Sequence, residues 1–359
     1  MIARILPPSG FSYQYGDKLA DHLPMTLSAL RRLGATEARQ EAFARRYIVE
    51  KALRKLDPAS AEAHARSALV ARIARDGRDV VLRSELHELA RGLGGGAFHA
   101  LIRVAYAIAD RDDVDLAAGL AYWRHAYLDL GEISRPNVDE EATGATPFDV
   151  DDALANACAI LRDVPARLDD GALIAHRMAM VAREPAFESV VDDARVRARD
   201  LPLIASTAVR GFAATRSFTM LHAMTATHAI RVLLPYASDA DTTVRYLWRA
   251  FVAAYTSAGL PEIPTETALL QHDAEAPTWE ALGARACSSD DEHVIKAAFT
   301  AREEDRAYAS PSYRVAVARY LKLISSIDVR NDTKRAAARA TALRVRRLAT
   351  YARTLSRLR

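Results

Sequence analysis

The chain is poor in cysteine and lysine and has no long apolar run. Its 359 residues include only two cysteines, Cys158 and Cys287, which excludes a disulfide scaffold and a zinc site of four cysteines. Six residues are lysine, whereas 43 are arginine. No segment approaches the ~18 apolar residues of a membrane span. The first residues, MIARILPPSG, lack the apolar run of a signal peptide. We therefore expect a soluble, cytoplasmic protein.

Residues that favour helix formation dominate the composition of the chain. Half of the residues are hydrophobic, which is enough for a sizeable core. Alanine, leucine and arginine recur with helical periodicity, and alternating runs of β-branched residues are absent. We therefore expect an all-α fold, in which residues 1–333 form one large helical domain with an internal pocket. The expected helices are 17–33, 36–56, 59–75, 78–91, 97–109, 113–128, 150–162, 169–183, 187–198, 201–214, 218–234, 241–258, 290–308, 311–326 and 332–357.

Positive charge is concentrated at the C-terminus. Residues 334–359 contain nine basic residues and no acidic ones, so the rest of the chain has a formal net charge of −6, against +3 for the whole. Such a tail is compatible with binding to a nucleic acid or an acidic partner. Because arginine is abundant throughout, we favour a basic terminal helix that packs on the acidic domain. We expect neither a nucleic acid nor a membrane as a partner.

Three segments look irregular or glycine-rich. Residues 131–149 and 259–289 are interrupted by proline and glycine and are expected to be loops. The glycines of GLGGG at 92–96 follow a helical pattern, whereas a dinucleotide-binding loop follows a strand. We therefore interpret them as a helix stop and a tight turn.

The ten histidines fall into two groups. A single histidine on an apolar helical face is commonly a hydrogen-bonded core residue. Because this chain has five such histidines, a metal site remains an open interpretation. Those with polar neighbours, expected at the surface, are His64, His87, His125, His176 and His272. Those in apolar helical segments are His22, His99, His222, His228 and His293.

Two helical segments place these histidines in defined positions. His99, Arg103 and Tyr106 fall within about 60° on one helix, where they either line a cavity or join a buried hydrogen-bond network with a carboxylate. His222 and His228 are about 120° apart on another helix, so they do not easily share one ion. His228 is the one expected to pack or to support other residues.

The segment DDEHVIKAAF, residues 290–299, is the most informative. His293 and Lys296 are neighbours on one face of a helix that Asp290 is expected to cap. A buried ammonium must pair with a carboxylate, lose its proton or be modified. An ordinary ion pair and a carboxylated lysine both remain open. Near the N-terminus, Pro24 favours a helix start that could direct His22 inward.

Five segments, taken together and in order, resemble the questin oxidase family. This resemblance implies an oxygen-dependent enzyme that cleaves a quinone ring of a polyketide in a Baeyer–Villiger-like or dioxygenase step. Carried over by motif, the family's histidines fall on His22, His99, His222 and His293, and its lysine falls on Lys296. The matching segments are DHLPMTLSALRRLGA (21–35), GGGAFHALIRVAYAI (94–108), LAAGLAYW (116–123), FTMLHAMTATHAIRVLLP (218–235) and DEHVIKAAFTA (291–301).

The working hypothesis is a non-haem iron oxygenase of secondary metabolism. Imidazole ligands do not select the metal, but oxygen chemistry favours iron over zinc. We expect Arg103 to stabilise a substrate anion and Tyr106 to hydrogen-bond to it. NADPH remains a candidate electron source.

Other residues and functions stay open. Asp21, Asp291 or Glu292 could orient the ligands, and Trp123 and Phe299 could form aromatic walls or simply pack in the core. One alternative function is a metal-free, NADPH-dependent monooxygenase of Baeyer–Villiger type. The other is a non-enzymatic helical protein that binds a partner through the basic tail.

Overall fold

Helices make up almost all of the regular structure, as expected for an all-α fold. The computed structural model describes residues 8–133, 148–192 and 194–327. A two-stranded antiparallel sheet, β1 (Gln14–Tyr15) and β2 (Leu19–Ala20), precedes the first α-helix. The described α-helices are α1 (Leu23–Leu33), α2 (Glu37–Glu50), α3 (Ala61–Asp76), α4 (Arg78–Leu89), α5 (His99–Asp110), α6 (Asp113–His125), α8 (Val150–Leu161), α9 (Ile174–Ala182), α10 (Phe187–Asp192), α11 (Leu201–Thr215), α12 (Phe218–Leu233), α13 (Ala240–Ser257), α14 (Glu266–Leu270), α15 (Trp279–Cys287), α16 (Glu292–Tyr308) and α17 (Ser312–Tyr320).

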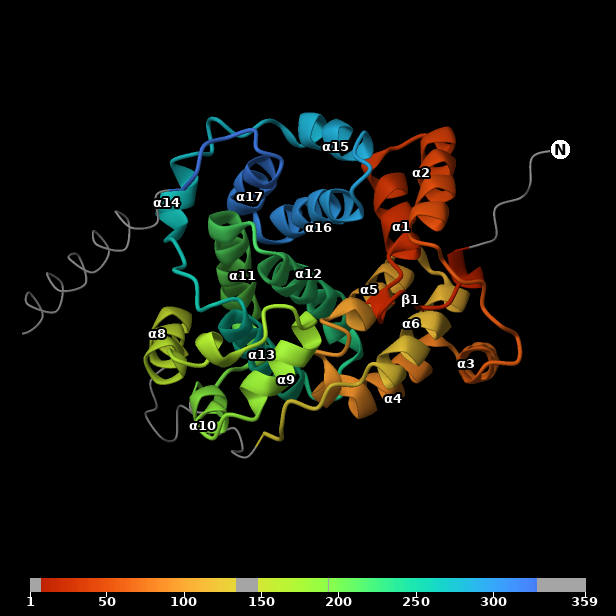
Figure 1. Ribbon diagram of the computed structural model, residues 1–359, viewed down its shortest axis with the longest axis horizontal. Coiled ribbons are helices and arrows are strands. Elements are labelled where there is room, and N and C mark those ends of the chain that lie inside the picture. Colours follow the sequence, from red (N-terminus) through yellow and green to blue (C-terminus); the bar gives the residue numbers. More distant parts are fainter. Residues whose placement is uncertain (1–7, 134–147, 193, 328–359) are drawn as a thin grey trace, which may run out of the picture.

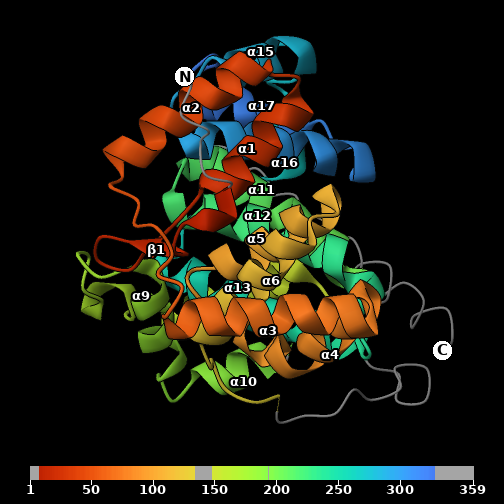
Figure 2. The ribbon, with the colours of Figure 1, turned by 90° about the vertical axis from the view of Figure 1, so that its right-hand side faces the viewer.

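Helix α12 lies at the centre of the fold and packs against α5, α11, α13 and α16 (Figure 1). Its residues 219–230 are all buried, as expected for a helix that is apolar on every side. Helix α1 packs against α16, so the first and the penultimate described helices lie side by side (Figure 2). This arrangement brings α1, α5, α12 and α16 together, and each of them carries or follows one of the apolar-group histidines.

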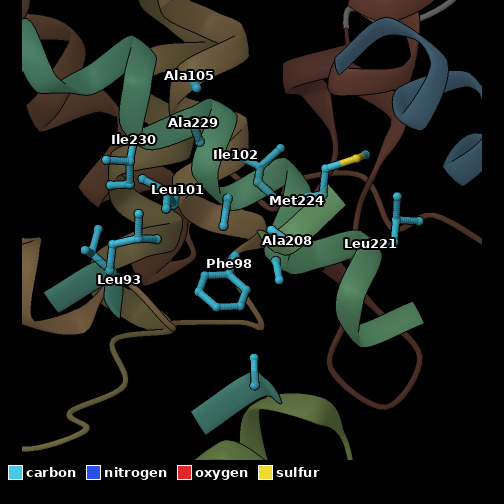
Figure 3. Close-up of a cluster of buried hydrophobic side chains, with 14 of the residues drawn as sticks. Leu93, Phe98, Leu101, Ile102, Ala105, Ala208, Leu221, Met224, Ala229 and Ile230 are labelled. Atoms are coloured by element: carbon cyan, nitrogen blue, oxygen red, sulfur yellow. The ribbon is translucent and has the colours of Figure 1, made fainter. Parts of the chain in front are cut away.

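The core between these helices is built from aliphatic and small side chains. Figure 3 shows Phe98, Leu101 and Ile102 facing residues of α11 and α12. Close approach requires small residues at some positions. A Cβ at Gly119 of α6 would lie 2.9 Å from the Cγ2 of Val104, so α5 and α6 could not pack as they do with a larger residue there.

Several local expectations are confirmed. Helix α1 ends at Leu33 and is followed by the C-cap residue Gly34, which has a φ of 92°. Thr36 caps α2 by accepting a hydrogen bond from the backbone N–H of Arg39. Helix α12 ends at Leu233, before Pro235.

The glycines at 92–96 form a turn that packs closely on its surroundings. A Cβ at Gly95 would lie 2.5 Å from the backbone oxygen of Ala126, and the indole N–H of Trp123 donates to the oxygen of Gly92 over 3.0 Å. Ala97 and Phe98 follow with positive φ values of 54° and 70°. These two non-glycine residues in the left-handed region immediately precede His99, which places backbone strain beside a candidate site.

Some expected boundaries were wrong. Residues 259–289 contain α14 and α15, which begin directly after the capping threonines Thr265 and Thr278. The helix expected over 17–33 starts only at Leu23, because residues 14–20 form the hairpin. Helix α2 ends at Glu50, since residues 54–56 hydrogen-bond to the backbone of residues 10–12 instead.

Other expectations lie outside the described residues. These include the helix expected over 332–357, the basic tail and most of the loop expected over 131–149. None of the described helices is long and apolar enough to cross a bilayer.

Candidate metal centre

Four histidines from the beginnings of four helices meet at one place. His22 is the N-cap of α1, His99 and His293 lie in the first turns of α5 and α16, and His222 is the fifth residue of α12. The ring centroid of His22 lies 4.6 Å from that of His99 and 4.7 Å from that of His293. The ring centroids of His99 and His222 are 4.5 Å apart. One ring nitrogen each from His22, His99 and His293 lie within 4.8 Å of one another.

His99 and His222 face each other through their Nε2 atoms, which are 2.9 Å apart. The Nδ1 of His99 is 2.5 Å from the backbone oxygen of Gly96, and that of His222 is 2.7 Å from the backbone oxygen of Phe218. A carbonyl oxygen only accepts, so each Nδ1 carries the ring proton. In the neutral rings, both Nε2 atoms are then unprotonated, so two lone-pair nitrogens lie 2.9 Å apart.

His22 and His293 contribute further unpaired nitrogens. The Nδ1 of His22 and the Nε2 of His293 are buried and have no hydrogen-bond partner among the described residues. On its other side, His293 has its Nδ1 3.4 Å from the Oδ1 of Asp291. Asp291 also caps α16, so the expectation that Asp290 caps this helix was wrong. The contact with His293 lowers the pKa of Asp291 to about 2.

The environment keeps the four rings neutral. Burial lowers the pKa of His22, His99 and His222, that of His99 to about 3, and the nearby Lys296 ammonium lowers all three further. Burial also lowers the pKa of His293. The positive ends of the helix dipoles disfavour imidazolium in the same way. Neutral imidazole is the form that binds a metal.

Lys296 lies one turn after His293 and is buried, with 5% of its surface exposed. Burial lowers its pKa from 10.5 to about 8. No carboxylate of the described residues forms an ion pair with it, although Glu292 and Asp291 favour its charge at longer range. The ordinary ion pair that the sequence left open is therefore absent from the described part of the chain.

Glu292 lies between the histidines and the surface. Its Oε1 is 3.1 Å from the Nζ of Lys51, 3.8 Å from the Nδ1 of His293 and 3.9 Å from the Nδ1 of His22. The carboxylate therefore lies just beyond hydrogen-bond distance of both rings. The sequence gives no indication that Lys51, at the end of α2, lies next to Glu292. This contact depends on how α2 packs in the fold.

Comparison with known proteins shows which family the chain belongs to. The family model described as questin oxidase-like matches residues 19–301. The chain belongs to the questin oxidase-like family. No curated protein matches it. Family membership indicates an oxidoreductase, and the matched range contains all four histidines and Lys296.

The two other residues predicted for the questin oxidase-like site have partners elsewhere. The Nε and Nη2 of Arg103 donate to the Oδ1 of Asp115 over 3.0 and 2.5 Å, which supplies the carboxylate of a buried network. Its Nη1 is buried without a partner among the described residues. The hydroxyl of Tyr106 lies 3.2 Å from the Oγ1 of Thr300, and its ring packs on Phe299. Within the described part of the chain, no hydrogen bond, ion pair or ring contact joins Arg103 or Tyr106 to the four histidine rings.

His228 belongs to a separate buried group, as its angular position on α12 indicates. Its Nδ1 is 2.6 Å from the Oε1 of Glu304, which also accepts from Arg231. Trp123 and Phe299 are buried and pack in the core. Of the five histidines expected at the surface, four are exposed and His272 is half-buried.

Sequence reasoning missed Phe218. Its ring centroid lies 4.5 Å from that of His222 and 4.4 Å from that of His293. An isolated phenylalanine at a helix start gives no signal for such a position.

Proposed function

We propose that this chain is an oxygen-using oxidoreductase of secondary metabolism with a non-haem iron site, acting on a quinone-like or related aromatic small molecule. The ligands are His22, His99, His222 and His293, and Lys296 in carboxylated form completes the set. The observation that carries the proposal is the 2.9 Å separation of two unprotonated Nε2 atoms.

Three things could lie between two facing lone pairs: a proton, a water molecule or a metal ion. A proton would make one ring cationic, which burial and Lys296 both oppose. A separation of 2.9 Å leaves no room for a bridging water. A metal ion accepts both lone pairs, and adjacent ligands with bonds of about 2.1 Å lie roughly 3.0 Å apart. The donor set therefore fits a metal ion best.

The chemistry of the family favours iron. Four imidazoles alone suit iron, copper, nickel or zinc, but reaction with O2 requires a redox-active ion. Bound iron would supply the one-electron chemistry that lets O2 react with an organic substrate. The chain's own contribution is to hold the rings in place, through the oxygens of Gly96 and Phe218 and the carboxylate of Asp291.

Carboxylation of Lys296 would resolve its unfavourable charge. With a pKa of about 8, roughly a tenth of the amine is unprotonated at pH 7, far more than for an ordinary lysine. The neutral amine attacks CO2, forms a carbamate and releases one proton. The product replaces a buried cation with an anion that offers oxygen ligands, and the converging helix N-termini favour that negative charge.

The roles of Arg103 and Tyr106 stay predictions. Arg103 has one free donor, Nη1, with which to stabilise a substrate anion. Tyr106 would have to exchange its contact with Thr300 for one with the substrate. NADPH as an electron source is likewise a prediction.

Metal analysis of protein purified without a histidine tag tests the proposal. Wild type should contain about one iron per chain, and His99→Ala and His293→Ala should lose it. His176→Ala removes an exposed histidine and serves as the matched control. Unchanged metal in both site variants would contradict the ligand assignment. A metal-free preparation that oxidises substrate with NADPH would favour the metal-free alternative.

A further inference from the structure

One aromatic side chain of the histidine cluster reaches the surface. Eight of the nine phenylalanines are buried, whereas Phe218 is 46% exposed. Its ring contacts His222 and His293 edge-on, with interplanar angles of 66° and 65°. Phe218 therefore lies between two proposed iron ligands and the solvent.

The backbone fixes this position independently of the side chain. Helix α11 ends at Thr215, its C-cap residue Arg216 has a φ of 54°, and α12 begins two residues after Arg216 with Phe218. The backbone oxygen of Phe218 accepts the hydrogen bond from the Nδ1 of His222. Since that oxygen remains after any substitution, the side chain is not required for orienting His222 in this way.

We propose that the exposed part of the Phe218 ring is the surface against which a planar aromatic substrate stacks at the histidine cluster. This inference rests on the proposed function and names Phe218 as a residue that determines specificity for the aromatic substrate proposed there. The electron-rich face of a phenylalanine attracts the electron-poor ring of a quinone, and half of this residue is free to make such a contact. An aliphatic substrate would gain little from an aromatic side chain over an aliphatic one.

The test is binding of 1,8-dihydroxyanthraquinone to the metal-loaded full chain, measured by equilibrium dialysis without O2. Phe218→Leu keeps an apolar side chain but removes the ring, and Phe218→Trp keeps an aromatic one. We expect Phe218→Leu to raise Kd about 3- to 10-fold and Phe218→Trp to stay within about twofold of wild type. Leu173→Ala alters a similarly exposed apolar residue and should leave Kd unchanged.

Two outcomes overturn the inference. One is an equal Kd for wild type and Phe218→Leu. The other is loss of metal in Phe218→Leu, because Phe218 would then act by packing on the ligands. Failure of the proposed function looks different: the wild type would lack iron and would not consume O2, while the dialysis measurement would still report on the Phe218 contact.

Discussion

Replacing Lys296 should make the metal-free protein more stable while abolishing its metal site. Burial lowers the pKa of this lysine from 10.5 to about 8, so the folded state opposes the charged amine. A difference of about 2.5 pKa units corresponds to roughly 3 kcal/mol. This penalty is present in full below pH 8, shrinks as the pH rises towards 10.5 and vanishes above it. Lys296→Met, which removes the charge at similar volume, should therefore raise the free energy of unfolding by up to about 3 kcal/mol at pH 7.

Urea unfolding of chelator-treated protein in CO2-free buffer measures this effect. The gain of Lys296→Met over wild type should be largest at pH 7 and nearly absent near pH 10. Lys55→Met, at an exposed position, is the matched control and should change stability little at either pH. A Lys296→Met variant that is no more stable than wild type at pH 7, or whose advantage does not shrink with rising pH, would refute the reasoning.

Three further predictions concern buried ionisable side chains. Asp115→Ala leaves the Arg103 guanidinium unpaired and should lower the free energy of unfolding in urea by about 3–5 kcal/mol. Adding Arg103→Met to this variant should restore part of that free energy. A double variant that is no more stable than Asp115→Ala would contradict the pairing. Because burial lowers the pKa of His99 to about 3 from 6.5, metal-free protein should lose stability as the pH falls below 6.5. The free energy of unfolding of His99→Phe should fall by up to about 1.4 kcal/mol less per pH unit than that of wild type. If the free energy of unfolding falls equally steeply with pH in both proteins, His99 is not held neutral. Glu304→Ala should lower the free energy of unfolding by about 3 kcal/mol, and the variant should still bind iron. Loss of iron from this variant would show that the buried group around His228 affects the proposed metal site.

The sequence predicts the helices well where start and stop signals are local. Gly34 and Thr36 mark a boundary through their own backbone and side-chain chemistry, and the structure places it there. Helices α14 and α15 were missed because the prolines between 261 and 277 favour a loop. The capping threonine that precedes each short helix is a weaker signal than these prolines. The hairpin at 14–20 was missed because two-residue strands have no periodicity to detect.

The candidate site was predictable in its members but not in its geometry. Helical positions alone identify His99 and His222 as buried, and the family resemblance selects them as ligands. Nothing in either segment indicates that their Nε2 atoms face each other, since that depends on how α5 packs against α12. Arg103 shows the same limit: its helical face is evident, but its partner Asp115 lies on the next helix.

The orientation of the proposed ligands His99 and His222 is nevertheless encoded locally. His99 bonds to the oxygen of Gly96 three residues earlier, and His222 bonds to the oxygen of Phe218 four residues earlier. Each ring is thus held by the first turn of its own helix, and packing of α5 on α12 then brings the two fixed rings together. A site built this way is oriented before any ion binds, so little reorganisation opposes binding. The strained backbone at Ala97 and Phe98 is consistent with this view, because it sets the start of α5 and with it the position of His99.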